Sequence, residues 1–285
     1  MYCGKILMLT LTRKVTFTAG HIYRGGGLSP QQLEELFGIA AEPSGHGHNY
    51  VLELSVRGEV SPIDGMVINI KDVDAALKEL LSVIDHRMLN TALPEFADAV
   101  PTTEKLAQVL WLRIPKKIGG AQAVSMRLEE HPGLHVELNG ACPHMVYLTN
   151  SIEFAASHRL HTDRLSAEEN LRIYGKCNNP HGHGHNYVAE VTVVGEPDSR
   201  TGVVIDLGKL DQLLKAEIEG RFDHKHLNLD TADFKDKPAT AENIAIVIWN
   251  LLEKKIPACR DGGQVKLHRV RLIETARSWF DYFGA

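Results

Sequence analysis

The sequence predicts an α+β protein built from two tandem modules, each a four-stranded antiparallel sheet with two helices on one face. Three observations support this prediction. The seven residues Gly45–Val51 recur letter for letter as Gly182–Val188. Each copy follows a run of alternating apolar residues, which is typical of a strand. Each copy also precedes two segments with helical apolar spacing and a last strand-like run.

The repeat extends along most of the 285 residues. His158 follows His21 by 137 positions, and this interval grows to 138 and finally to 144 along the second half. The matched pairs include His158 with His21, Leu214 with Leu77, Asp223 with Asp85, Thr240 with Thr102, and Glu274 with Glu130. A period of about 140 residues is that of two ordinary domains and is far longer than a solenoid repeat. We therefore expect one module at residues 1–143 and another at 144–285.

Strands are predicted where apolar residues alternate or form short runs between turn residues. The expected strands are Val15–Ala19 and Ile152–Ala156, Asn49–Val56 and Asn186–Val194, a short Gly202–Ile205, and finally Val124–Glu130 and Lys266–Glu274. A small open sheet with helices on one side leaves its edges unpaired, so we expect closure between modules.

Helices are predicted from their capping residues and apolar faces. Ser166–Glu169 has the spacing of a capping box, and Ser29–Gln32 is its counterpart in the first half, with proline at the first helical position. Asp206, or Asn69 in the first half, is the expected N-cap of an amphipathic helix. The apolar face of that helix carries Leu210, Leu213, Leu214 and Ile218. A second helix is expected from Thr240 to Ile256.

The composition is that of a soluble globular protein, and the lack of a signal peptide at the start of the chain predicts a cytoplasmic location. Hydrophobic residues make up 44% and charged residues 24%, with a net charge of −5. These values give no electrostatic indication of a nucleic-acid or membrane partner. The start of the chain has neither the long apolar region nor the cleavage site of a signal peptide. The four cysteines do not recur at matching places in the two halves, so we expect free thiols at Cys3, Cys142, Cys177 and Cys259.

Two sets of three histidines are the strongest chemical signal. They are His158, His183 and His185 in the second half, and His21, His46 and His48 in the first. Residues two apart on a strand share a face, so a His-x-His pair and a third histidine on a neighbouring strand can hold one Zn²⁺. Three protein ligands with an open position are typical of a catalytic ion. The alternative is a solvated surface loop, which the second copy disfavours; His181 has Ser44 opposite it and is interpreted as a bystander.

Other residues of the second half are candidates for acid–base chemistry and binding. Cys177, in a turn-forming stretch before His183, is a candidate base if nearby metal lowers its pKa, or else a small buried apolar residue. Asp223 and His224 form either a proton relay or an ordinary helix-terminal pair. Glu274 can accept two N–H donors from a guanidine-like ring edge, or can form a strand-end ion pair.

Together these motifs resemble the 6-pyruvoyl-tetrahydropterin synthase family. The resemblance rests on Phe154–Leu160, Gly175–Tyr187, Asp223–Asn228 and Glu274–Thr275, and a degraded version covers the first half. It implies the tunnelling fold, in which modules with a four-stranded sheet and two helices form a ring around a barrel. Active sites in that fold lie between subunits. Three chains would supply the six modules of the family hexamer.

The resemblance also implies an activity. Members are carbon–oxygen lyases that convert 7,8-dihydroneopterin triphosphate to 6-pyruvoyl-tetrahydropterin with loss of triphosphate, using zinc and no redox cofactor. The three histidines of the second half would hold zinc. Cys177 would be the base, with Asp223 and His224 as the relay. Glu274 would anchor the pterin, with Thr240 and Glu242 as further pocket residues.

The first half departs from this pattern at one decisive position, because Ala40 replaces the cysteine. We expect a zinc pocket formed by its three histidines but no synthase activity. Glu42, four residues before His46, lies where related branches place their catalytic cysteine, and some relatives use a glutamate as the base to cleave the side chain of dihydroneopterin. A second activity is therefore an alternative to a solvated Glu42.

Two rival functions remain open. A 6-carboxy-tetrahydropterin synthase has the same fold, but a shorter interval between cysteine and histidine than the one from Cys177 to His183. A zinc-binding scaffold without turnover fits the first half, whereas Cys177, Asp223, His224 and Glu274 together are hard to explain in a scaffold.

Overall fold

The computed structural model describes residues 7–262 and 264–284 and divides the chain into two compact units. The first unit comprises the described residues up to Leu148 together with Val194–Asp206, and the second comprises Thr149–Val193 and the described residues from Leu207 onward. The segment Val194–Asp206 therefore belongs to the second half of the sequence but packs within the first unit.

The sheet of the first unit has four long antiparallel strands. They are β1 (Met8–His21), β2 (His46–Glu59), β5 (Ala121–His131) and β6 (Leu134–Asn139), in the order β6-β5-β2-β1. Short strands β3 (Arg87–Met88) and β4 (Lys117–Ile118) pair with β1 and β5. Alternate side chains of β2, from Tyr50 to Val56, are fully buried, as the two-residue period of a strand requires.

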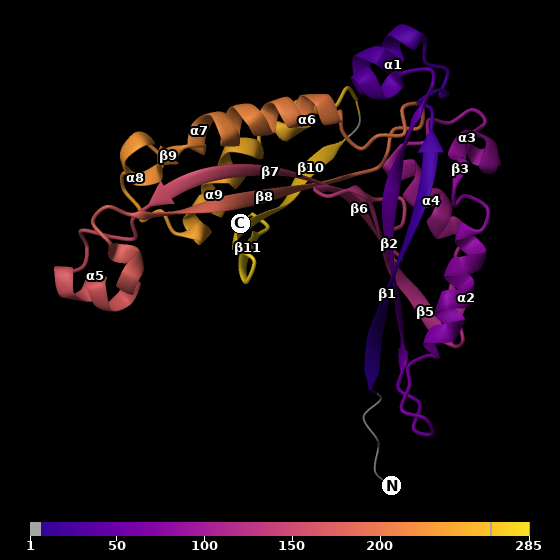
Figure 1. Ribbon diagram of the computed structural model, residues 1–285, viewed down its shortest axis with the longest axis horizontal. Helices are drawn as coiled ribbons and strands as arrows, with labels where there is room; N and C mark the ends of the chain where they lie inside the picture. Colours follow the sequence, from indigo (N-terminus) through magenta and orange to yellow (C-terminus); the bar gives the residue numbers. More distant parts are fainter. Residues whose placement is uncertain (1–6, 263, 285) are drawn as a thin grey trace. The chain divides into compact units, whose positions relative to one another are not determined.

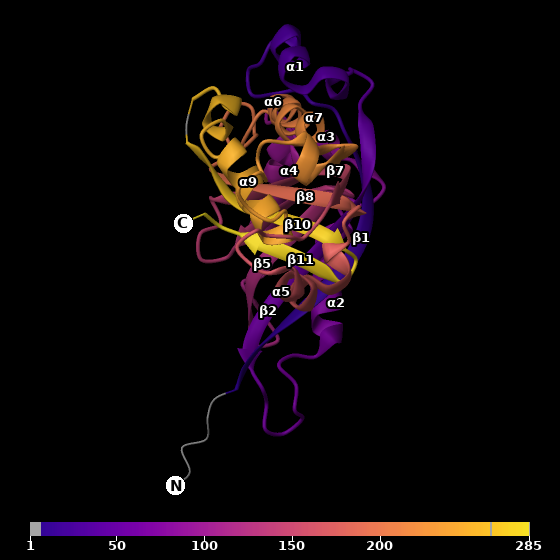
Figure 2. The same ribbon diagram turned by 90° about the vertical axis from the view of Figure 1, so that its left-hand side faces the viewer.

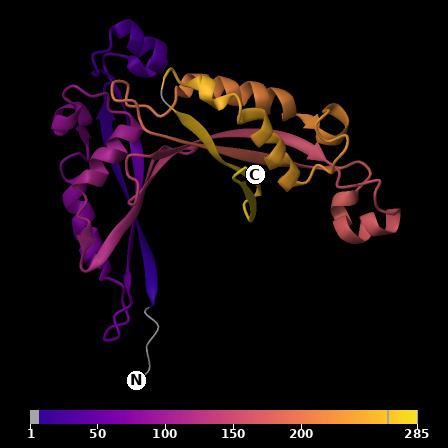
Figure 3. The same cartoon turned by 180° about the vertical axis from the view of Figure 1, so that it is seen from behind.

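The helices of the first unit are α1 (Pro30–Phe37), α2 (Ile70–Leu81), α3 (Leu89–Ala92) and α4 (Thr103–Arg113), with 3-10 turns η1 (Gly38–Ala41) and η2 (Pro94–Phe96). The long helices α2 and α4 cover one face of this sheet (Figure 1). Figure 3 shows α2 and α4, the two long helices, on the same side of the strands. Leu77 of α2 and Leu106 of α4 are almost fully buried in the core between helices and sheet. Helix α1 instead lies beyond the ends of β1 and β2 (Figure 1).

The second unit repeats this plan. Its strands are β7 (Val146–His158), β8 (His183–Gly195), β10 (Val265–Thr275) and β11 (Ser278–Tyr282), in the order β11-β10-β8-β7, and the short β9 (Lys225–His226) pairs in parallel with β7. Its helices are α5 (Ala167–Tyr174), α6 (Leu207–Leu214), α7 (Gly220–Phe222), α8 (Leu227–Asp230) and α9 (Ala241–Leu252), with turns η3 (Gly175–Asn178), η4 (Lys215–Glu219, π-helical) and η5 (Ile256–Cys259). Figure 2 shows β10 and β11 side by side, with α9 next to them.

The predicted mixed α and β content is confirmed, and so are several local details. Ser29 and Ser166 both form the predicted capping boxes. The Asn69 side chain accepts from the N–H of Lys71 at 3.0 Å and caps α2. Helix α6 begins at Leu207, directly after Asp206.

One predicted strand is wrong. Gly202–Ile205 is irregular, because Gly202 has a φ of 78° and the N–H of Val204 donates to the Glu104 side chain instead of to a strand. The fourth long strand of each unit is β6 or β11, and each of these forms a hairpin with the strand before it.

No helix within the described residues is long and apolar enough to cross a membrane. As predicted, Cys142, Cys177 and Cys259 form no disulfide within the described residues, whereas Cys3 lies outside those residues.

Candidate metal centres

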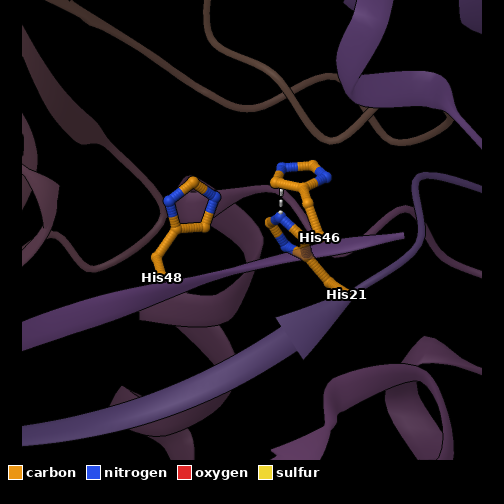
Figure 4. Close-up of side chains that lie close together, drawn as sticks. All are labelled: His21, His46 and His48. Carbon is orange, nitrogen blue, oxygen red and sulfur yellow. Dashed lines mark hydrogen bonds between the residues drawn. The ribbon is translucent and has the colours of Figure 1, made fainter. Parts of the chain in front are cut away.

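The three histidines of the first unit converge from two paired strands (Figure 4). His21 is the last residue of β1 and lies opposite His46, the first residue of β2. His48 shares a face with His46 because side chains two apart on a strand point the same way. The strand pairing itself therefore brings the three rings together.

A hydrogen bond to a backbone carbonyl fixes the orientation of the His21 ring. Nδ1 of His21 lies 3.1 Å from the carbonyl oxygen of Pro101, so the ring donates N–H to that carbonyl. Its Nε2 then carries the lone pair and lies 3.0 Å from Nε2 of His46. A histidine that binds a metal usually donates its other ring N–H to a backbone carbonyl, a carboxylate or water.

The second unit repeats the arrangement with His158, His183 and His185. Nδ1 of His158 lies 2.6 Å from the carbonyl oxygen of Ala239, and its Nε2 lies 3.1 Å from Nε2 of His183. In each trio one ligand atom from every ring lies within 4.8 Å of the others. Nitrogens bound to one tetrahedral zinc are roughly 3.3 Å apart, given bonds of about 2.0 Å. The His21–His46 and His158–His183 distances of 3.0 and 3.1 Å are close to that spacing, and the third ring of each trio is within 4.8 Å.

Electrostatics favour the neutral rings that a metal requires. Burial lowers the pKa of His21 to about 3 and that of His158 to about 4, and the neighbouring rings add to both effects. Burial also lowers the pKa of His48 and of His183. Among the described residues, the buried Nε2 atoms of His48 and His185 have no hydrogen-bond partner. Buried ring nitrogens that lack a hydrogen-bond partner and lie close to the other two rings are expected where the three rings share one cation. Each trio can therefore hold a metal ion.

A carboxylate lies beside each trio. Oε1 of Glu130 is 3.5 Å from Nε2 of His48, and Oε1 of Glu274 is 3.8 Å from Nε2 of His185. Glu130 is buried and accepts a hydrogen bond from the Thr103 hydroxyl. Ala241 stands at the corresponding place in the second unit, so Glu274 lacks this donor and its oxygens remain available for a ligand.

Asp223 and His224 form a defined pair. Nδ1 of His224 lies 2.7 Å from Oδ2 of Asp223, while Oδ1 accepts from the N–H of Ala155 at 2.8 Å. His224 has a φ of 54°, and its N–H donates to the Ala155 carbonyl. Its side chain is 84% exposed. Asp85 and His86 repeat the pair, with a φ of 58° at His86.

His224 lines a 610 Å³ cavity together with His185 of the trio. Cys177 is half-buried in η3, and its carbonyl accepts from the N–H of Leu160 at 2.8 Å, which ties its turn to the chain just after His158. Within the described residues no hydrogen bond joins Cys177 to Asp223 or His224.

In the first unit the cysteine position is part of an apolar cluster. Ala40 packs with Phe37 against Tyr23, whose ring centre lies 4.6 Å from that of His21. The cavity beside His48 and His86 is smaller, at 360 Å³. Glu42 lines a different, 740 Å³ cavity beside Tyr23 and α1.

The remaining predicted pocket residues differ between the units. Thr240 caps α9 by accepting from the N–H of Asn243, and Glu242 in the first turn of that helix is exposed. Their counterparts Thr102 and Glu104 are each only 2% exposed.

Sequence reasoning missed the buried tyrosines beneath the trios. The Tyr187 hydroxyl lies 3.4 Å from both ring nitrogens of His158, and burial, with Glu274 and Cys177 nearby, raises its pKa. Tyr187 shares the parity of His183 and His185, so this signal was present in the repeated segment. The hydrogen bond from Thr103 to Glu130 could not be predicted from the repeat, because the matching position of the second half is Ala241.

Comparison with known proteins decides the family. The sequence profile of 6-pyruvoyl tetrahydropterin synthase matches the chain twice, at residues 10–141 and 147–285. The chain belongs to this family. Each matched region contains one histidine trio and the carboxylate beside it.

Several relatives in the 6-pyruvoyl tetrahydropterin synthase family match about half of the chain. The 6-pyruvoyl tetrahydrobiopterin synthase of Drosophila melanogaster is 41% identical over 140 residues, 49% of this chain and 80% of the relative. That of Homo sapiens is 43% identical over 137 residues, 48% of this chain and 90% of the relative. A 6-carboxy-5,6,7,8-tetrahydropterin synthase of Rickettsia bellii is 29% identical over 147 residues, 46% of this chain and 95% of the relative. The solved Caenorhabditis elegans 6-pyruvoyl tetrahydropterin synthase is 37% identical, with a TM-score of 0.45, over 50% of this chain and 96% of that one.

Proposed function

We propose that the second half of the chain catalyses the zinc-dependent conversion of 7,8-dihydroneopterin triphosphate to 6-pyruvoyl-tetrahydropterin, with loss of triphosphate. The proposal rests above all on the histidine trio with Glu274 beside it, in a half that also carries Cys177. The family membership supports it, since relatives carry the name 6-pyruvoyl tetrahydrobiopterin synthase. In this proposal the chain has two tunnelling-fold modules, residues 1–143 and 144–285.

The residues of the second half have distinct roles in this proposal. His158, His183 and His185 hold the zinc, which when bound polarises the side-chain oxygens of the substrate as a Lewis acid. The Glu274 carboxylate accepts two N–H donors from the pterin ring edge, and this orients the side chain of the substrate toward the trio. Thr240 and Glu242 line the same pocket.

Proton transfer falls to the remaining three residues. The Cys177 thiolate removes a proton from the carbon next to a substrate oxygen. His224 is oriented by Asp223 through their 2.7 Å contact, and its exposed ring moves protons between substrate and solvent. Loss of the triphosphate and internal rearrangement then follow without a redox cofactor.

The first half binds a second zinc ion in this proposal but lacks synthase activity. Ala40 provides no base, and its turn η1 packs against the apolar cluster around Tyr23. Cleavage of the dihydroneopterin side chain by Glu42 is the alternative. The position of Glu42 in a separate cavity disfavours it.

Two other functions compete with the synthase. A 6-carboxy-tetrahydropterin synthase would use the same trio, and one relative carries that name. A non-catalytic zinc scaffold would retain the trios alone. We further propose a cytoplasmic protein that self-associates through three chains giving six modules, without a nucleic-acid or membrane partner.

Product analysis tests the proposal. Purified zinc-loaded chain is incubated with 7,8-dihydroneopterin triphosphate, and the pterin product and triphosphate are measured by chromatography and mass spectrometry. The synthase produces 6-pyruvoyl-tetrahydropterin and one triphosphate per turnover. Acetaldehyde with a carboxy-pterin would assign the rival activity, and the absence of turnover would favour the scaffold.

The variant Cys177→Ala locates the base. We expect turnover to be abolished with the zinc content unchanged, because the cysteine is not part of the trio. Cys142→Ala is the matched control, since Cys142 is also free and half-buried but lies outside the site. Wild-type activity in Cys177→Ala would reject the assigned base.

A further inference from the structure

A cavity of 470 Å³ in the second unit is lined by more cations than carboxylates. Its volume is within the range of about 300–1,000 Å³ that is usual for small-molecule sites. The chain as a whole has a net charge of −5, so this local excess of positive charge does not follow from the composition. The arginine and lysine residues that line the cavity are Arg159, Arg164, Lys235 and Lys237, and the carboxylates are Asp163 and Asp236.

The cations of this cavity are available to bind a ligand. Arg164, Lys235 and Lys237 are exposed, and within the described residues their side chains make no hydrogen bond or ion pair. Arg159 is half-buried, and its Nε donates to the carbonyl oxygen and to the side-chain oxygen of Asn178, at 3.3 and 3.1 Å. Its terminal guanidinium nitrogens have no partner in the described part of the chain, so this guanidinium is held in place but can still donate.

The two carboxylates do not neutralise these cations by contact. The Asp163 side chain is fully exposed and lies 3.6 Å from Nε2 of His161, not from an arginine or a lysine. Asp236 is exposed and forms no ion pair within the described residues. A cavity in which one sign of charge predominates attracts ligands of the opposite sign. The ligand expected here is therefore an anion.

Phosphate groups are the anions that this arrangement fits. A guanidinium with free terminal nitrogens can donate two parallel hydrogen bonds to phosphate oxygens, and lysines add compact charges on flexible side chains. The four cations come from two loops, residues 159–164 and 234–238. Cations spread over two loops suit an anion with several charges along a chain better than a single carboxylate. The chemistry indicated is that of a polyphosphate.

The cavity adjoins the metal site of the second unit. Arg159 directly follows His158, the last residue of β7. His226 lines this cavity and also the 610 Å³ cavity that contains His185 and His224. Nδ1 of His226 is buried and has no hydrogen-bond partner among the described residues. A ligand with one part at the trio can therefore extend another part into the basic cavity.

The first half lacks the cations of this cavity. The counterparts of Arg159, Arg164, Lys235 and Lys237 are Ile22, Gly27, Ala97 and Ala99. Arg24, the counterpart of His161, lines the separate 740 Å³ cavity beside α1. The cations thus occur only in the half that also carries Cys177. This distribution indicates a role in the second-half site.

We propose that the basic cavity binds the triphosphate chain of the substrate, with Arg159, Arg164, Lys235 and Lys237 as its phosphate-binding residues. That the chain belongs to 7,8-dihydroneopterin triphosphate rests on the proposed function, whereas the binding of a polyphosphate does not. In this arrangement Glu274 holds the pterin and the cations hold the opposite end of the substrate. The side chain between them lies at the trio, and the cavity selects the phosphorylated pterin over the free one.

Binding of inorganic triphosphate to the full zinc-loaded chain tests the cavity without turnover. Lys235→Gln combined with Lys237→Gln removes two cations, and we expect the dissociation constant from titration calorimetry to rise at least tenfold. Lys254→Gln combined with Lys266→Gln is the control, because both lysines are exposed in the same unit and lie outside the cavity. Triphosphate that contacts the trio metals contributes equally in both double variants. Equal dissociation constants in the two would overturn the proposal.

Arg164→Gln tests the other loop of the cavity. The Arg164 side chain has no partner among the described residues, so folding should be preserved. We expect the triphosphate dissociation constant to rise at least threefold. Arg172→Gln is the control, since Arg172 is exposed in the last turn of α5 and lies outside the cavity. The same affinity in both arginine variants would contradict a site shared by the two loops.

Steady-state kinetics decide whether the bound phosphate chain is that of the substrate. In the variant of Lys235 and Lys237 we expect KM for 7,8-dihydroneopterin triphosphate to rise at least tenfold and kcat to change less than about threefold, because the lost binding is shared by ground state and transition state. The dissociation constant of 7,8-dihydroneopterin, which has no phosphate, should stay unchanged. A general defect in the pocket would weaken both ligands and reject a phosphate-specific role. An unchanged KM beside weakened triphosphate binding would assign the cavity to a free polyphosphate and overturn the substrate assignment.

The two proposals fail separately. If the wild-type chain has no synthase activity, the proposed function fails, whereas the triphosphate titration still decides whether the cavity binds a polyphosphate. If the wild type is active but the two lysine double variants have equal KM and equal triphosphate affinity, the cavity proposal fails and the function stands.

Discussion

Nδ1 of His158 lies 2.6 Å from the carbonyl oxygen of Ala239, the residue before the cap of α9. The two residues are 81 positions apart, and His21 makes the equivalent contact with Pro101, 80 positions further along the chain. A helix start thus fixes the tautomer of the first ligand in each unit. Its Nε2 is left as an acceptor that faces the other two rings.

Metal content per chain tests both trios. We expect two zinc ions in the wild type and one in His183→Ala, because removing one of three ligands leaves too few nitrogens to hold the ion. His181→Ala is the control; His181 lies outside the trio, so this variant keeps two. Elemental analysis after dialysis gives the count. Two ions in His183→Ala would show that the ligand set is wrong.

The relay is tested by comparing His224→Asn with His86→Asn. Both histidines have positive φ values, which asparagine tolerates, and both are largely exposed, so folding should be preserved. A positioned acid–base group contributes about 10²–10⁴ in rate. We expect kcat to fall by that factor in His224→Asn and to change less than about twofold in His86→Asn. Equal losses in both variants would place turnover in both units.

The histidine trios could be predicted because the two-residue period of a strand decides which side chains share a face. Strand parity puts His183 and His185 on one face, and the repeat identifies His158 as their partner. The same rule extends to Tyr187, so the tyrosine beneath the trio was within reach. Strand β6, which forms a hairpin with β5, could also have been predicted. Gly133 lies just before it and has a positive φ of 97°, which favours glycine in the turn.

Other features depend on contacts that no local pattern contains. Val204 belongs to an apolar run that resembles a strand, but its N–H bonds Glu104 across 100 residues. The relation of Cys177 to His224 is equally non-local, since the two residues lie on separate turns. The sequence could therefore identify these residues as candidates but could not predict which of them lie close together in the fold.

Glu104 makes the stability of the first unit depend on pH. Burial raises the pKa of its carboxyl from 4.5 to about 7, against the opposing hydrogen bond from Val204. The folded state therefore holds a proton that the unfolded state has lost. Stability from this group is fully present below pH 4.5 and is lost as pH rises to about 7. The loss is roughly 3 kcal/mol.

Glu104→Gln should remove this dependence, because the amide keeps an acceptor for Val204 and cannot ionise. We expect the variant to gain roughly 3 kcal/mol over the wild type between acidic pH and pH 8. Urea unfolding at several pH values measures the difference. Glu34→Gln, at an exposed position of α1, is the control and should show no comparable trend. Parallel curves for wild type and Glu104→Gln would contradict the shifted carboxyl.

Gly65 and Gly202 form a matched pair that separates backbone strain from contact. Both have φ near 75°, with values of 73° and 78°, so alanine at either position costs about 1–2 kcal/mol. Only at Gly202 does the new Cβ meet Thr102 and the Val100 carbonyl, at 3.1 and 3.2 Å. We expect Gly202→Ala to be the less stable variant, by at least about 1 kcal/mol, in urea unfolding.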